Sequence, residues 1–225
     1  MKKLLLLLPL SISFLSAADW PRWLGPDGTG VSNEKDWQPN LEKIAWKAKV
    51  GLGFSAVSVA DGRLFTMGHD GIKQGGKETV WCLDSTTGKR LWSNSYEAQL
   101  VDYLHEGGPC ATPTVDGETV YSISEDGRIN AYFAAKGTLL WSKNMMTAAG
   151  MKKPPEWGFA GSPYVLDDLL IIEADYTFAL KKDSGKEVWR SKKYRHAYGS
   201  PVAFPQGSKT LIATLKTDGR VILNA

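Results

Sequence analysis

The side chains best suited to metal or nucleophilic chemistry are scattered along this chain of 225 residues. Its three histidines, His69, His105 and His196, lie far apart in the sequence. His105 and Glu106 match the first half of the zinc motif His-Glu-x-x-His, but no second histidine follows at the helical spacing that brings two imidazoles to one metal ion. We therefore predict no metal site and interpret His105 as a solvated loop histidine, with a metal role as the alternative.

Signatures of nucleophilic and phosphate chemistry are missing too. A nucleophile elbow needs the order Gly-x-Ser-x-Gly, and neither GFSAV nor GSPYV has that spacing. Gly75 and Gly76 lie between two strand signals rather than before a helix, which predicts a hairpin turn instead of a phosphate-binding loop. No catalytic residue is predicted.

The element that recurs along the chain is the phrase Gly-x-x-x-Trp. The copies read GKRLW (Gly88–Trp92), GTLLW (Gly137–Trp141) and GKEVW (Gly185–Trp189), and an incomplete earlier copy ends at Trp46. The tryptophans follow one another at intervals of about 48 residues. A period of roughly 40–50 residues indicates a stacked or radial array of one small unit.

Each unit is predicted to contain four short antiparallel strands. In the clearest unit, apolar runs are separated by turns at Asp116-Gly117, Asp126-Gly127 and Lys136-Gly137, where glycine accepts a positive φ. The predicted strands are Ala111–Val115, Thr119–Ser124, Arg128–Ala134 and Thr138–Lys143. Four antiparallel strands in about 48 residues are the layout of a β-propeller blade.

The tryptophan of each unit falls in the fourth, outermost strand. A large flat ring there can cover the seam with the neighbouring blade, and its burial contributes on the order of 1.5–3 kcal/mol. The preceding glycine makes the turn from the third strand. The residues assigned to this structural docking role are Trp46, Gly88, Trp92, Gly137, Trp141, Gly185 and Trp189.

Several phrases resemble a known family. LDSTTGKRLW (Leu83–Trp92) and LKKDSGKEVW (Leu180–Trp189) resemble the tryptophan-docking repeats of the pyrroloquinoline quinone (PQQ)-like β-propellers, which occur in quinoprotein alcohol dehydrogenases and in the outer-membrane assembly propeller BamB. The opening Asp19–Ser32 and the segments Gly107–Gly127 and Trp157–Val165 are similar to secreted PQQ-like repeat proteins. The resemblance implies an all-β propeller of four-stranded antiparallel blades.

The number of blades leaves two alternatives. About three full blades are expected at 53–95, 110–143 and 160–191, with a partial first one at Ile44–Val50 and a partial last one at Tyr198–Ala225. In one alternative the strand at Trp46 closes the last blade and gives a four-bladed ring. In the other, which we predict, the chain is an incomplete ring, and the resemblance implies a seven- or eight-bladed whole.

The first residues have the pattern of an export signal. Lys2 and Lys3 precede an apolar run that ends in small residues, which predicts a signal peptide over 1–18 with cleavage near Ala18. An N-terminal extension is expected over 19–43 and the propeller blades over 44–225. The mature chain is then periplasmic or extracellular, without a transmembrane span. Losing two lysines from a formal net charge of +3 leaves it near neutral, so no nucleic-acid partner is expected.

The cysteines bear on any cofactor. In an oxidising compartment Cys82 and Cys110 either pair or remain two buried thiols. By resemblance, a PQQ-dependent dehydrogenase holds its cofactor between a tryptophan and two adjacent cysteines, beside a calcium ion and an aspartate base. This chain has no adjacent cysteine pair. No cofactor is therefore predicted, and PQQ and Ca²⁺ belong to an alternative in which the cofactor site is lacking or lies outside this chain.

Two long connections are the candidate ligand face. The segments Glu97–Pro109 and Thr147–Gly158 join an outer strand to the next inner strand, and in a propeller such loops gather around the axis on one face. Trp157 either stacks on a flat ligand or anchors its loop under Pro154-Pro155. We predict a secreted, non-catalytic scaffold for a protein, peptide or other ligand, whereas the alternative for the loops is a variable surface cover. The candidate residues are Tyr103, His105, Glu106 and Trp157.

Overall fold

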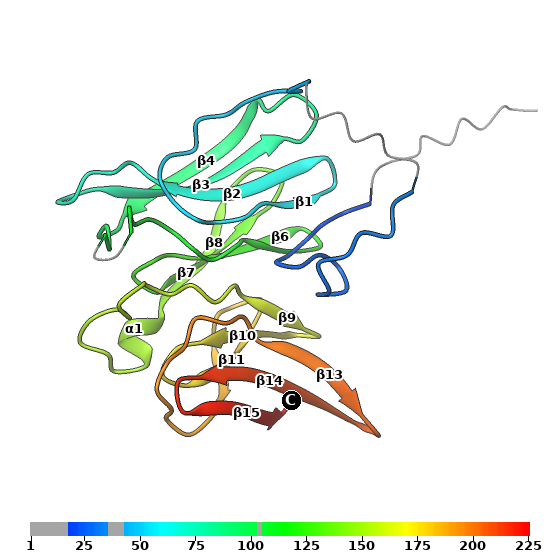
Figure 1. The fold of residues 1–225 in the computed structure, drawn as a ribbon, viewed down its shortest axis with the longest axis vertical. Helices are drawn as coiled ribbons and strands as arrows, with labels where there is room; N and C mark the ends of the chain where they lie inside the picture. The colour runs from blue at the N-terminus through cyan, green and yellow to red at the C-terminus, as the bar shows by residue number, and fades with distance from the viewer. Residues whose placement is uncertain (1–17, 36–42, 103–104) are drawn as a thin grey trace, which may run out of the picture.

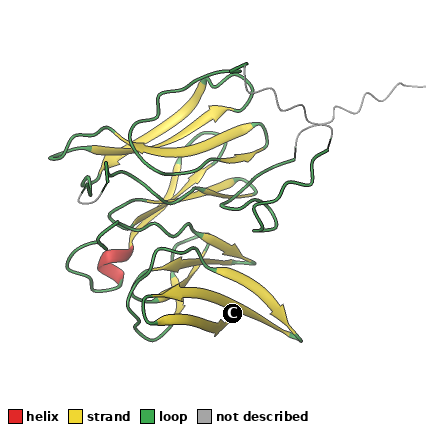
Figure 2. Ribbon diagram, in the orientation of Figure 1, coloured by secondary structure: helices red, strands yellow, loops and turns green. Residues whose placement is uncertain are grey.

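Four antiparallel sheets follow one another along the chain and through space (Figure 1). The computed structural model describes residues 18–35, 43–102 and 105–225. Figure 2 shows strands and loops with one short helix, α1 (Met145–Ala148), in the described chain. The expected all-β class is confirmed, and the strands of each sheet pair in sequence order.

The first three sheets have four strands each and the fourth has three. The first contains β1 (Ser58–Ala60), β2 (Arg63–His69), β3 (Lys77–Asp84) and β4 (Arg90–Glu97). The second contains β5 (Thr114–Asp116), β6 (Thr119–Ile123), β7 (Arg128–Phe133) and β8 (Leu139–Asn144). The third contains β9 (Tyr164–Leu166), β10 (Leu169–Glu173), β11 (Thr177–Lys181) and β12 (Glu187–Arg190). The fourth contains β13 (Val202–Gln206), β14 (Lys209–Lys216) and β15 (Gly219–Asn224).

The hairpin turns form where the sequence offers residues that tolerate a positive φ. Asp61 and Gly62, between β1 and β2, have φ values of 51° and 70°, as a tight two-residue hairpin turn requires. In the second sheet the predicted strands agree with β6 and β7 to within about a residue, but β5 begins at Thr114 rather than Ala111. The amide of Thr112 instead donates to the hydroxyl of Ser162, just before β9 of the next unit, at 2.9 Å, so it is not available to β6.

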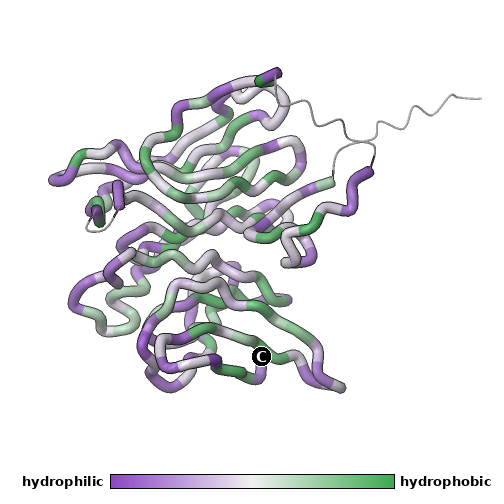
Figure 3. The backbone as a smooth tube through the Cα atoms, viewed as in Figure 1, coloured by the Kyte–Doolittle hydropathy of each residue, from purple (hydrophilic) through white to green (hydrophobic). Residues whose placement is uncertain are grey.

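The core lies between neighbouring sheets rather than inside any one of them. Phe65 of the first sheet packs with Val120 and Tyr132 of the second, and Ile171 of the third packs with Ile212 of the fourth. A larger cluster joins the second and third sheets through Ile123 and other apolar side chains. Figure 3 shows hydrophobic segments along the strands and mostly hydrophilic loops at their ends. This is the packing of an array in which each unit contacts its neighbours.

The sheets form an incomplete ring. The sheet β13-β14-β15 has three strands, and Trp46 does not add a fourth to it. Trp46 lies instead against Gly88 of the first sheet, at the opposite end of the array. Residues 44–50 carry no assigned strand, which differs from the outer strand expected there, because no neighbouring strand pairs with them along their length. The incomplete propeller, not the four-bladed ring, is therefore the observed arrangement.

A short N-terminal segment crosses three sheets. Trp20 exchanges two backbone hydrogen bonds with Val59 of β1, at 2.7 and 2.8 Å. The carbonyl of Pro21 accepts from the amide of Val115 in β5 at 2.7 Å. The guanidinium of Arg22 lies over the ring of Tyr164 in β9, 4.7 Å from its centroid. We call these three residues the strap, because each contacts the innermost strand of a different sheet.

The expected signal peptide falls almost entirely on residues 1–17, which lie outside the described residues. Among the helices of the described chain, none has the length and hydropathy needed to cross a bilayer.

Candidate functional site

Three of the repeated tryptophans, Trp46, Trp92 and Trp141, pack on the glycine of the following unit. The indole N–H of Trp92 donates to the carbonyl of Ala134 at 2.7 Å, and a Cβ added to Gly137 would lie 2.6 Å from Cδ2 of that indole. Gly137 also has a φ of 71°, so both its backbone and the space above it favour glycine. The tryptophan therefore sits where a side chain on the neighbouring turn would clash.

The same relationship recurs in the other units. The indole N–H of Trp46 donates to Ser85 at 3.1 Å, and that of Trp141 donates to Lys182 at 3.0 Å. Trp46 lies on Gly88 and Trp141 on Gly185, and Trp189 packs with the apolar cluster between the third and fourth sheets. Trp92, Trp141 and Trp189 lie at seams between sheets, and Trp46 covers the outer side of the first sheet, so all four have a structural location.

The longer connections gather on one face. Because the strands alternate in direction, the β4–β5, β8–β9 and β12–β13 connections lie on the same face as the β2–β3, β6–β7 and β10–β11 turns. We call this the loop face. His105 meets Phe54 edge-on at 5.0 Å between ring centroids, and its Nδ1 accepts from the amide of Gly107. Glu106 is exposed beside it. Tyr103 lies outside the described residues.

Trp157 lies at another point of the loop face. Its ring stacks on Tyr198 at 5.1 Å between centroids with 35° between the planes, and 42% of the residue is exposed. Tyr198 in turn meets His196 edge-on at 6.1 Å. Trp157 and Tyr198 come from two different connections, so the stack joins the β8–β9 connection to the β12–β13 connection.

Two cavities open on the loop face. The first has a volume of about 630 Å³ and the second about 720 Å³, and both are lined by Lys153 and His196. Volumes of roughly 300–1,000 Å³ are typical of ligand sites. The first cavity is lined by polar and charged side chains that include Lys152, Lys153, Asp175, Lys193, Arg195, His196 and Asp218. The second is lined by Gln99, Leu100, Val101, Asp102, Lys153, Pro154, Pro155, Glu156 and His196.

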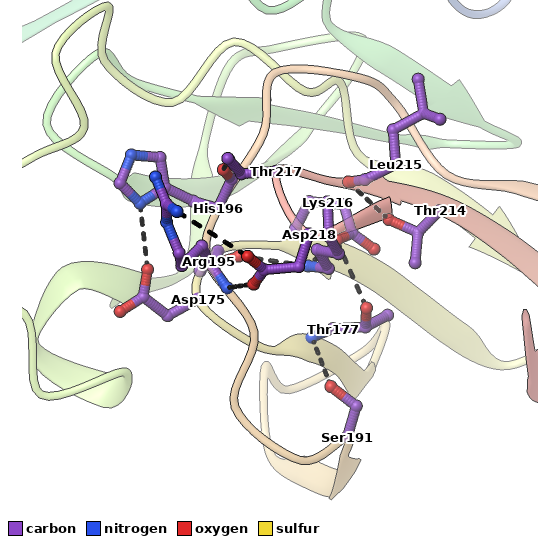
Figure 4. Close-up of polar contacts among 12 residues, drawn as sticks. Asp175, Thr177, Ser191, Arg195, His196, Thr214, Leu215, Lys216, Thr217 and Asp218 are labelled. Atoms are coloured by element: carbon purple, nitrogen blue, oxygen red, sulfur yellow. Dashed lines mark hydrogen bonds and ion pairs between the residues drawn. The ribbon is translucent and has the colours of Figure 1, made fainter. Parts of the chain in front are cut away.

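The two acids of the first cavity already have cationic partners (Figure 4). Asp175 lies 3.1 Å from Nδ1 of His196 and 3.2 Å from Nζ of Lys193. Asp218 accepts from the amide of Arg195 at 3.2 Å and lies 3.8 Å from its guanidinium. These contacts fix the β12–β13 connection against the β10–β11 and β14–β15 turns.

Of the charged residues of this cavity, the sequence indicated the loop of Lys152 and Lys153 but not Asp175, Lys193, Arg195 or Asp218. The available signal was the basic run Lys192–His196, which falls in the third of three equivalent connections. Asp175 follows β10 and Asp218 follows β14 at equivalent positions. An aspartate at such a position is ordinarily interpreted as a turn residue. Only the fold brings the three segments together.

Two buried carboxyl groups organise the β4–β5 connection. Glu78 is fully buried and accepts from the amide of Glu125 at 2.8 Å and from the hydroxyl of Tyr96 at 3.0 Å. Glu125 accepts from the amides of Val101 and Gly108 at 3.2 and 3.1 Å. Burial raises the pKa of Glu78 to about 8 and that of Glu125 to about 7. The sequence feature that could have identified Glu78 is its position in an alternating strand, where it is a charged residue on the buried face.

The cysteines remain free thiols. Cys82 is buried in the core and Cys110 is half-buried, and burial raises their pKa to about 12 and about 11. They belong to different units and form no bridge. The described residues also contain no group of three or more His, Cys, Asp or Glu side chains placed to hold a metal ion. The two free cysteines therefore do not form the adjacent pair that the resemblance implies for a PQQ site.

Comparison with known proteins gives the same architecture. The chain is 27% identical over 186 residues to the quinohemoprotein alcohol dehydrogenase ADH-IIG of Pseudomonas putida, covering 76% of this chain and 24% of that enzyme. The crystal structure of the quinohemoprotein alcohol dehydrogenase from Comamonas testosteroni matches with a TM-score of 0.62 and 18% identity, covering 88% of this chain and 36% of that one. The structure of the P. putida HK5 enzyme ADHIIG gives 0.53 and 20%, covering 75% and 29%.

The successive four-stranded sheets with tryptophan-on-glycine seams define a PQQ-like β-propeller with an incomplete ring. The chain spans about a quarter of the length of the curated relative that it resembles. It belongs to the family described as outer membrane protein assembly factor BamB, whose model matches residues 31–173.

Proposed function

We propose that this chain is a non-catalytic β-propeller scaffold, exported from the cytoplasm, that binds a protein or peptide partner on its loop face. The observation that carries the proposal is the pair of cavities of about 630 and 720 Å³ that share Lys153 and His196. One extended ligand can reach both, since they have common walls. Loop clusters held by a rigid sheet array are frequent binding surfaces.

The aromatic stack supports this proposal. Trp157 is partly exposed and packs on Tyr198, which supports its ring. Tryptophan anchors that are already ordered lose little conformational freedom on binding and often carry much of an interface's free energy. The description of the family as an outer-membrane assembly factor also favours a role in protein contacts over catalysis, and the expected signal peptide favours the periplasm.

A PQQ-dependent dehydrogenase is the second candidate. The observation that favours it is the 27% identity to a quinohemoprotein alcohol dehydrogenase. On that view the cofactor groups lie in the three quarters of the enzyme that this chain does not span. The chain itself would then supply blades and part of the loop face.

Two measurements separate the candidates. In the first, PQQ and CaCl₂ are titrated into the purified chain while tryptophan fluorescence and dye-linked alcohol oxidation are followed. Saturable quenching accompanied by turnover would overturn the scaffold proposal. In the second, a random peptide library is selected on the immobilised chain, and binding is compared with a Trp157→Ala variant and a Val188→Ala control on the exposed face of β12. Peptides that lose affinity only for Trp157→Ala support the scaffold.

A further inference from the structure

We infer that the loop face recognises an extended peptide that carries an acidic side chain next to an apolar one. This inference rests on the proposed scaffold function and adds the chemistry of its ligand. The acidic group would enter the first cavity and the apolar group the second.

The first argument is the charge of the first cavity. Its lining contains four cationic side chains, Lys152, Lys153, Lys193 and Arg195, and two carboxylates, Asp175 and Asp218. The two carboxylates are occupied, because Lys193 and His196 contact Asp175 and Arg195 contacts Asp218. A site with more cations than anions attracts a carboxylate ligand.

The second argument is that two of these cations are unused. Lys152 and Lys153 are exposed on the β8–β9 connection, and within the described chain neither has an acidic side chain at ion-pair distance. Lysine ammonium groups can each donate to a carboxylate oxygen. The internal ion pairs therefore order the wall of the cavity and leave these two lysines for a ligand.

The third argument is the different lining of the second cavity. Leu100, Val101, Pro154 and Pro155 supply apolar surface, and Pro155 and Leu100 are themselves buried and therefore fixed. Gln99 and Glu156 are exposed polar residues of the same lining. Asp102 is paired with Lys73 at 2.6 Å. This combination of an apolar floor with polar edges suits one aliphatic or aromatic side chain.

The fourth argument is the adjacency of the cavities. Because Lys153 and His196 line both, the acidic and apolar groups of one ligand must be close together. An extended peptide advances about 3.3 Å per residue, so groups within roughly three residues of each other fit this arrangement.

The experiment uses the full chain and three fluorescein-labelled octapeptides. The first carries two adjacent aspartates followed by leucine and valine in a Gly/Ser background, the second replaces both aspartates by asparagine, and the third replaces the leucine and valine by serine. Binding is measured by fluorescence anisotropy. We expect the first peptide to bind on the order of tenfold more tightly than either other peptide, and we expect its affinity to fall with added salt.

The matched variants test the site. The double variant Lys152→Glu/Lys153→Glu should lose at least about tenfold in affinity for the aspartate peptide, which is a change of about 1.4 kcal/mol. The control Lys136→Glu/Lys186→Glu makes the same charge change at exposed lysines of the β7–β8 and β11–β12 turns, on the opposite face, and should bind as the wild type does. Circular dichroism establishes that each variant is folded.

The outcomes separate this inference from the proposed function. Equal affinity for the aspartate and asparagine peptides, or equal loss in both double variants, overturns the acidic-peptide inference. If the selected library peptides then still depend on Trp157, the scaffold proposal stands without it. If neither the designed nor the selected peptides bind, both are overturned.

Discussion

Lys216 of β14 reaches from the fourth sheet to Glu173 of β10 in the third, and both side chains are buried. The ammonium group contacts the carboxylate and also donates to the carbonyl of Ala174 at 3.2 Å. Thr177 donates to the same carboxylate. Burial acts to raise the pKa of Glu173 and the ammonium of Lys216 acts against it. The seam between the last two sheets therefore contains a buried polar bridge in addition to its apolar cluster.

Removing one partner of this bridge should destabilise the chain strongly. Lys216→Met leaves the Glu173 carboxylate buried without its cation, and such a change costs about 3–5 kcal/mol. The double variant Glu173→Leu/Lys216→Met should recover most of that loss, since no charge remains to be desolvated. Urea unfolding followed by tryptophan fluorescence measures both. A double variant as unstable as the single one would show that the pair stabilises the fold beyond compensating its own burial.

The packing of tryptophan on glycine predicts that substitution by alanine destabilises the chain more at Gly137 than at Gly117. Gly137→Ala places a methyl group within 2.6 Å of the Trp92 ring at a φ of 71°, so it combines backbone strain of about 1–2 kcal/mol with an overpacking cost of about 1–3 kcal/mol. Gly117→Ala is the matched control, because Gly117 has a φ of 54° and no atom near its added Cβ. The difference in unfolding free energy isolates the packing part. Equal losses at the two positions would remove the docking role from Gly137.

The raised pKa of Glu78 predicts a dependence of stability on pH. Its folded value of about 8 exceeds the unfolded value of 4.5, so the folded chain binds more protons between these values and loses stability as pH rises through that window. The slope from this one group is at most about 1.4 kcal/mol per pH unit. Glu78→Gln should flatten the dependence between pH 5 and 8, as measured by thermal unfolding. An unchanged slope would indicate that Glu78 titrates near its ordinary value.

The aromatic stack gives a prediction for binding alone. Trp157→Ala should weaken peptide affinity by about 2 kcal/mol or more, as for a hot-spot residue, with a smaller effect on folding because 42% of the residue is exposed. Val188→Ala, which also trims an exposed apolar side chain, should change neither. If Trp157→Ala lowers the stability of the chain strongly but leaves the peptide affinity unchanged, Trp157 is a loop anchor, which is the alternative named in the sequence analysis.

The repeating parts of the fold could be predicted because they obey local rules. A few neighbouring residues determine glycine turns, such as those at Gly117 and Gly137, and the alternating strands between them. The same local pattern recurs in each unit, which supports the prediction again. The position of Trp46 was harder to predict from the sequence. Its phrase resembles an outer strand, but strand formation depends on a neighbouring strand, and residues 44–50 have none along their length.

The site could be predicted only in part for a related reason. The long connections with Lys152, Lys153 and Trp157 stand out by length and composition. His196, Asp175 and Asp218 become neighbours only when the third and fourth sheets pack, and single turn aspartates give no signal of that. Glu78 could be predicted in part. The alternation of its strand places it on the buried face, but its partner Glu125 comes from another unit and gives no signal in the local sequence.

The strap has a consequence for the order of folding. Trp20, Pro21 and Arg22 touch β1, β5 and β9, so the segment can dock fully only after three sheets have formed and stacked correctly. An array of neighbouring contacts can otherwise fray one unit at a time. The strap adds a contact between sheets that do not adjoin, and so it makes release of the first unit depend on the third. We therefore expect this segment to dock among the last parts of the described chain, although it precedes all four sheets in the sequence.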